Sequence, residues 1–92
     1  MKYKPNDLSL LRYWKKLLDS LSSQLYSIAT EQRNFFSICD KSELIRDAAQ
    51  RMRLRRSDIL LLLRYLENQG ILKQATRTKK IKIHDNASVR KN

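Results

Sequence analysis

Apolar residues in the first third of the chain recur at alternating spacings of three and four, which is typical of a helix with one apolar seam. The seam is broken only at Gln32 and consists of Leu11, Trp14, Leu18, Leu21, Leu25, Ile28, Gln32 and Phe35. The pattern predicts a long helix capped by Asp7, preceded by a flexible arm over residues 1–6. Because Ser20, Ser22 and Ser23 weaken its middle, segment 7–38 is interpreted as one long helix or a helix pair.

Three uses of this seam remain open: packing on the chain's own core, a homodimer interface, or a site for a helix of another protein. The homodimer is the expected use, with the N-terminal half of the helix as the contact. The residues assigned to the dimer interface are Leu11, Trp14, Leu18, Leu21 and Leu25. Phe35, Phe36 and Ile38 are expected to fill the core beneath the following helices.

Two shorter helices are expected next, separated by a polar turn. Residues 41–52 carry apolar side chains at helical spacing, and Asp40 with Glu43 forms a capping box, with Ser42 as the rival cap. A third helix begins at Arg56 or Ser57 and runs to residue 68. Residue 53, between the two helices, requires the left-handed backbone that glycine usually supplies, yet it is an arginine.

The chain after Gly70 predicts two short strands. Segments 71–75 and 79–84 are the candidates, and in the second Ile81 and Ile83 alternate with polar residues, as in a half-buried strand. Residues 76–78 form the connecting turn, and residues 86–92 a basic tail. The expected fold is mostly α with a small β-wing.

Residues 48–72 resemble the helix-turn-helix of winged-helix regulators of the MarR, GntR and PadR classes, although no single family is indicated. The matching positions are Ala48, Ala49, Met52, Leu54, Arg55, Arg56, Ser57, Asp58 and Ile59, then Leu66, Glu67, Gly70, Ile71 and Leu72. The resemblance implies a winged helix-turn-helix over residues 39–85 that binds double-stranded DNA. Arg53 replaces the usual turn glycine, and Leu60 and Leu61 replace polar, DNA-facing residues.

Charge supports a polyanionic partner. The 92 residues carry a net charge of +11, and the balance is +2 over residues 1–45 (seven Lys/Arg, five acids) against +9 over residues 46–92 (thirteen, four). The longest apolar run, 59–63, is too short to cross a bilayer, so no membrane partner is expected. The N-terminus does not resemble a signal peptide, and the single Cys39 suits a reducing compartment. The expected location is the cytoplasm with the nucleoid, or the nucleus in a eukaryote.

The start of the third helix is the expected reading end, because free N–H groups and arginine side chains both bind phosphate and base edges there. The strand lysines are expected on the phosphate backbone. The candidate DNA-binding residues are Lys41, Ser42, Arg53, Arg55, Arg56, Ser57, Leu60, Arg64, Arg77, Lys79, Lys80 and Lys82. Asp58 is expected to stabilise the helix N-terminus rather than to read a base.

Leu60, Leu61 and Tyr65 leave three options open: contact with DNA, extra core packing, or a protein partner. No catalytic or metal-binding constellation is present: the only histidine, His84, is far in sequence from Cys39. The chain is therefore not expected to be an enzyme or to need a cofactor. The sequence predicts a small transcriptional or replication regulator that binds duplex DNA, with a winged-helix adaptor subunit of a larger assembly as the alternative.

Overall fold

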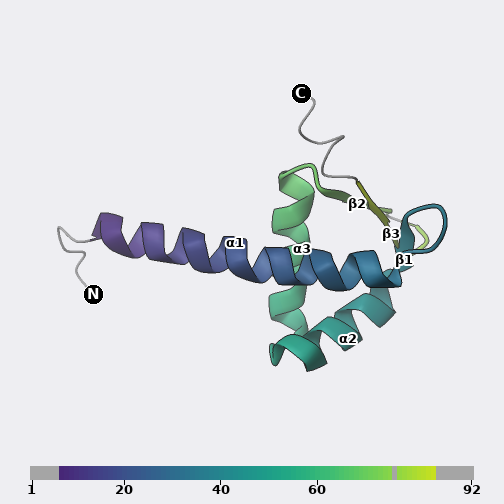
Figure 1. Ribbon diagram of the computed structural model, residues 1–92, viewed down its shortest axis with the longest axis horizontal. Helices are drawn as coiled ribbons and strands as arrows, with labels where there is room; N and C mark the ends of the chain where they lie inside the picture. The colour runs from purple at the N-terminus through teal and green to yellow at the C-terminus, as the bar shows by residue number, and fades with distance from the viewer. Residues whose placement is uncertain (1–6, 76, 85–92) are drawn as a thin grey trace.

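The computed structural model describes residues 7–75 and 77–84, with side chains from Tyr13 onward. The predicted arm, the basic tail, Thr76 of the turn and the side chain of Leu11 lie outside the described residues. Three helices and three strands follow one another: α1 Asp7–Gln32, β1 Ile38–Asp40, α2 Lys41–Met52, α3 Arg56–Asn68, β2 Leu72–Gln74 and β3 Lys80–Ile83. The described part is thus mostly helical with a small antiparallel sheet (Figure 1).

Helix α1 is a single 26-residue helix, about 39 Å long at 1.5 Å per residue. The alternative of two shorter helices is wrong, because serine disfavours a helix only weakly and tertiary packing overrides it. Ser22 is buried against the rest of the fold. The C-terminal half of α1 covers α2, α3 and the sheet, whereas its N-terminal half projects beyond them (Figure 1).

All three helices and the sheet contribute to one core. The fully buried residues of α1 among its described side chains lie in its second half, and α3 supplies one complete face, as its helical period predicts. The buried apolar residues are Leu25, Ile28, Ala29, Cys39, Leu44, Ala48, Ile59, Leu62, Leu63, Leu66, Leu72, Ile81 and Ile83. None of the helices in residues 7–75 is long and apolar enough to span a bilayer.

The sheet has the strand order β1-β3-β2, with both pairings antiparallel. Strands β2 and β3 lie within the predicted segments, and Ile81 and Ile83 face the core as the alternation predicts. Strand β1 is not evident in the sequence, because three residues are too few to show a period. Its Cys39 faces Ile81 across the β1–β3 pair, so β1 is defined by a partner 42 positions later.

The bounds of α2 and its N-cap match the prediction, whereas the second bond of the predicted capping box, from the Asp40 N–H to the Glu43 side chain, is not formed. The Asp40 carboxylate accepts a hydrogen bond from the Glu43 N–H at 3.0 Å, so Asp40 rather than Ser42 is the N-cap. At the other end Arg53 has φ 57° and ψ 46°, which is the left-handed conformation. The Leu54 N–H then bonds to the Ala49 carbonyl at 3.0 Å, which closes the turn toward α3.

The prediction that Phe35 and Phe36 fill the core is wrong. Both are exposed, at 94% and 67%, and they stack edge to face with ring centroids 5.6 Å apart. Helix α1 ends at Gln32, so Phe35 falls outside the helical seam that assigned it inward. The Asn34 carboxamide oxygen accepts from the N–H groups of Phe36 and Ile38, which fixes the turn that holds both rings outside. Only Ile38, in β1, is half-buried.

Candidate nucleic-acid interface

The N-terminus of α3 is organised by one acidic residue. The Asp58 carboxylate accepts from the Arg55 backbone N–H at 3.1 Å and from its Nε at 3.3 Å. A negative charge in the first turn of a helix is favourable, which agrees with the predicted capping role of Asp58. The same contact pairs the Nε edge of the Arg55 guanidinium with Asp58, while the side chain stays 84% exposed at the entrance of α3.

Two adjoining hollows follow the groove between α2 and the start of α3. Both are lined by Arg46 and Arg56, which therefore flank the groove. Ser42 and Leu60 line one hollow, and Ser57 lines the other. The sequence reading missed Arg46, although its spacing of four from Ser42 places both on one face of α2.

The outer face of α3 alternates arginine and leucine. Arg56, Leu60 and Arg64 lie four residues apart and form one stripe, and Leu61 lies beside it. Leu60 and Leu61 are 42% and 61% exposed. Extra core packing, one of the three options for these leucines, is therefore wrong: the core side of α3 is already complete.

The β2–β3 hairpin presents lysines on the outward face of the sheet. Lys80 and Lys82 of β3 are exposed, and Lys73 of β2 is the register partner of Lys82. Like charges directly opposite each other destabilise a sheet, so a bound anion would relieve this pair. The sequence reading missed Lys73, because only the register reveals its neighbour.

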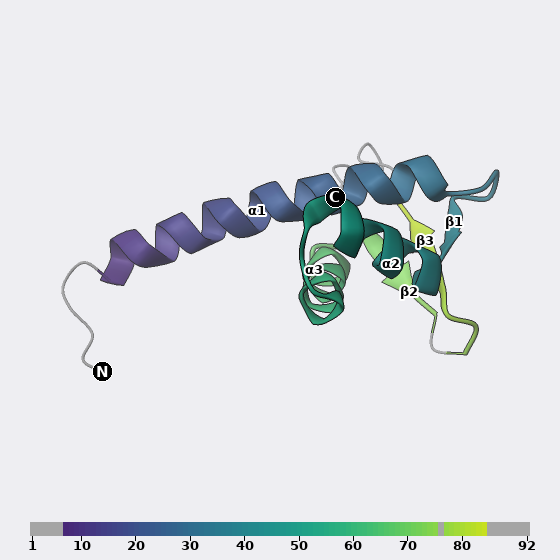
Figure 2. The same cartoon turned by 90° about the horizontal axis from the view of Figure 1, so that it is seen from below.

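The hairpin and α3 lie on the same side of α1. Figure 2 shows α1 along one edge, with α3 beneath it and the hairpin turn reaching away from α1 past α3. The hairpin is tied to α2 by the Lys41 N–H, which donates to the Lys79 carbonyl at 2.9 Å. The predicted DNA-binding residues are all exposed except Lys41, which is half-buried. The fold thus brings Ser42 of α2 and Arg56, Ser57 and Leu60 of α3 to one groove, and α3 and the hairpin to the same side of α1.

No relative was found. Searches of the chain against protein-family models, curated proteins and solved structures gave no match. The assignment of function therefore rests on the chemistry of the described surface.

The predicted dimer seam divides into two parts. Trp14 is 58% exposed on the projecting half of α1. Leu18 and Leu21 are half-buried against the chain's own core. Leu25 has no exposed surface, so its assignment to a dimer interface is wrong: α2 and α3 already cover that part of the seam.

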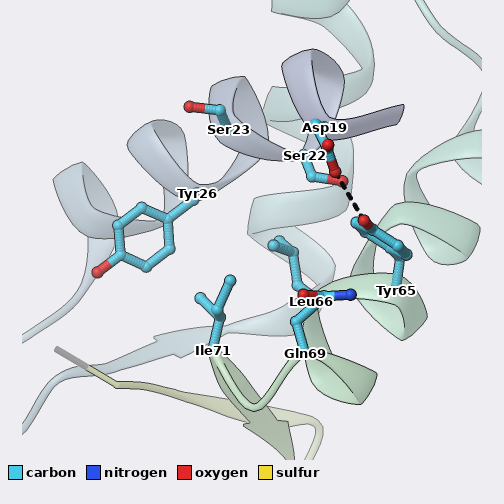
Figure 3. Close-up of a pocket in the computed structure, with 8 residues that line it drawn as sticks. All are labelled: Asp19, Ser22, Ser23, Tyr26, Tyr65, Leu66, Gln69 and Ile71. Carbon is cyan, nitrogen blue, oxygen red and sulfur yellow. Dashed lines mark hydrogen bonds between the residues drawn. The ribbon is translucent and has the colours of Figure 1, made fainter. Parts of the chain in front are cut away.

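A small polar pocket of about 190 Å³ lies between α1 and the C-terminal end of α3 (Figure 3). Its lining includes Ser22, whose hydroxyl is buried without a hydrogen-bond partner, and Tyr65, which donates to the Asp19 carboxylate at 2.7 Å. The Tyr65 hydroxyl, and then Lys15, hold the pKa of the Asp19 carboxyl below its usual value. Tyr65 therefore serves the contact between α1 and α3 rather than the surface of Leu60 and Leu61.

The described residues hold no cluster suited to metal binding. No group of three or more His, Cys, Asp or Glu side chains converges within residues 13–75 and 77–84. Burial, followed by the charge of Asp40, raises the pKa of the Cys39 thiol to about 11, which disfavours the reactive thiolate.

Proposed function

We propose that the chain binds double-stranded DNA as a small winged-helix regulator of transcription or replication. Helix α3 would enter the major groove, and the hairpin would contact the neighbouring phosphates. The element order and the β1-β3-β2 sheet support a winged-helix assignment, together with the sequence resemblance of residues 48–72. A regulator of this kind would act in the cytoplasm at the nucleoid, or in the nucleus of a eukaryote.

The observation that carries the proposal is the set of exposed basic side chains on α3 and the hairpin. Arg56 and Arg64 on α3 are exposed, and so are Lys80 and Lys82 on β3. The acidic residues of α3 are already engaged: Asp58 pairs with Arg55, and Glu67 accepts from the backbone and side chain of Gln74. Arg56 and Arg64 therefore have no carboxylate partner among the described residues, which suits a polyanion.

Binding of mixed-sequence duplex at several salt concentrations tests the proposal. Arg56→Ala and Lys80→Ala should each weaken binding and reduce the slope of log K against log salt by about one. Lys16→Ala is the matched control, because it removes the same charge from an exposed site on α1, away from the proposed surface. A wild-type protein that binds no duplex at low salt, or a control as weak as the two variants, would overturn the proposal.

The exposed leucines and the exposed Phe35–Phe36 pair favour a second candidate, an adaptor that binds a protein in a larger assembly. Leu61→Ser distinguishes the two functions. If the protein is an adaptor, Leu61→Ser should lose binding to a protein partner. In that case neither Leu61→Ser nor the wild-type protein should bind duplex. The DNA proposal predicts duplex binding by the wild-type protein that depends on α3.

We also propose that the projecting half of α1 joins two copies of the chain. Trp14, exposed on a helix segment beyond the core, is the side chain this contact would bury. Trp14→Glu should therefore yield monomers in sedimentation while the helical signal is kept, since Trp14 is not part of the core. A wild-type protein that is monomeric at high concentration would refute the dimer.

A further inference from the structure

The outer face of α3 carries an apolar centre inside a cationic frame. Leu60 and Leu61 expose 42% and 61% of their surface. Arg56 precedes Leu60 by one helical turn and Arg64 follows it by one turn. The two adjacent exposed leucines give α3 an apolar surface that a ligand can cover, and burying it would be favourable.

The occupant must match both features. It needs apolar groups at the centre of α3 and negative charge around them, and the negative charge must continue to the lysines of the hairpin. The major groove of duplex DNA supplies this combination, because the thymine C5-methyl is the apolar group on its floor and phosphates line both edges. A short acidic peptide would match α3, but it would leave the opposed Lys73 and Lys82 uncovered.

The start of α3 lacks the side chains that usually read an A·T pair by two hydrogen bonds. Residues 56–62 contain no Asn or Gln, the usual bidentate partners of adenine. Arg56 is suited to guanine or phosphate, Asp58 is occupied by Arg55, and the Ser57 hydroxyl can contact either type of base pair. The thymine methyl is therefore the feature of an A·T pair that Leu60 and Leu61 can recognise.

We propose that α3 recognises thymine by apolar contact of Leu60 and Leu61 with C5-methyl groups in the major groove. This inference rests on the proposed DNA binding. The preferred ligand is then duplex DNA that contains thymine. Arg56 and Arg64 bind the flanking phosphates or guanines.

Duplexes that differ only in that methyl group test the inference. Alternating d(A-T) and d(A-U) duplexes of equal length have the same hydrogen-bonding edges, and every register of the first presents methyl groups, so no target sequence need be known. Wild-type protein should bind d(A-T) more tightly, by about fourfold for each methyl buried. Leu60→Ser and Leu61→Ser remove exposed side chains and should reduce this preference, with circular dichroism confirming the fold.

The outcomes separate this inference from the function on which it rests. If the wild-type protein binds neither duplex at low salt, DNA binding itself fails and a protein occupant of α3 takes its place. If it binds both equally, DNA binding stands and methyl recognition is refuted. If both serine variants keep the full preference, the discrimination arises from duplex shape, and the role of Leu60 and Leu61 is refuted.

Discussion

Replacement of Arg53 by glycine should stabilise the protein. Arg53 ends α2 with φ 57° and ψ 46°, a region in which the Cβ of an L-residue crowds the following carbonyl. Glycine removes that crowding and keeps the backbone hydrogen bonds of the turn, including the bond from Leu54 to Ala49. The Arg53 side chain is exposed and forms no hydrogen bond or ion pair with the described residues, so its loss removes no contact there.

Two opposing effects set the magnitude. Relief of left-handed strain contributes about 1–2 kcal/mol. The greater freedom of glycine in the unfolded chain offsets about 0.5–1 kcal/mol of this. The net gain is about 0.5–1 kcal/mol, which for a domain of this size raises Tm by about 2–8 °C.

Thermal and urea unfolding of the wild-type, Arg53→Gly and Arg53→Ala proteins measure the effect. The alanine variant loses the same charge but keeps the Cβ, so it should be no more stable than wild type. Equal stabilisation of both variants would show that charge repulsion, not backbone strain, is responsible. A glycine variant less stable than wild type would refute the account of the turn.

Substitutions at three further positions test other contacts. Asp40→Ala removes the α2 N-cap and should lower the unfolding free energy by about 1 kcal/mol in urea titrations, whereas Asp40→Asn, which can still cap, should stay near wild type. Leu25→Ala opens a cavity in the core and should cost about 2–5 kcal/mol by the same measurement; a cost below 1 kcal/mol would show that Leu25 is not enclosed. Because the folded pKa of Asp19 is lowered, chiefly by Tyr65, its stabilising contribution is present above the unfolded carboxyl pKa and is lost as pH falls through the folded value. Tyr65→Phe should therefore be less stable than wild type at neutral pH, with a gap that narrows in acid; a gap independent of pH would assign the effect to packing instead.

The helices could be predicted from the sequence because the features that define them lie within a few residues of one another. The predicted bounds of α2 and the left-handed Arg53 follow from capping chemistry and apolar spacing, which involve neighbours within a few residues. The residues of α3 that face the core are likewise predicted by the helical spacing of its apolar side chains. Heptad spacing predicted the seam of α1 but not which part is covered, since that depends on where α2 and α3 pack, and Leu25 was misplaced for this reason.

The features that the sequence did not predict are set by distant partners. Strand β1 exists through its pairing with β3, and Lys73 faces Lys82 only because of the β2–β3 register. Phe35 was assigned to the core because the apolar seam was expected to continue to it. Helix α1 ends at Gln32, three residues before Phe35, and both phenylalanines are exposed. In the candidate interface the local cluster at Arg55 and Arg56 was predicted, whereas Arg46 joins it only through the packing of α2 on α3.

Because Cys39 is buried, the rate of its reaction with a thiol reagent can report on opening of the fold around β1. Its thiol is 3% exposed in β1, which lies at one edge of the three-stranded sheet, and its pKa is raised to about 11. A thiol reagent therefore reacts with Cys39 only after the packing around β1 opens, and the sequence contains no other cysteine to compete. The labelling rate at neutral pH thus reports on the opening of this part of the fold without any engineered probe.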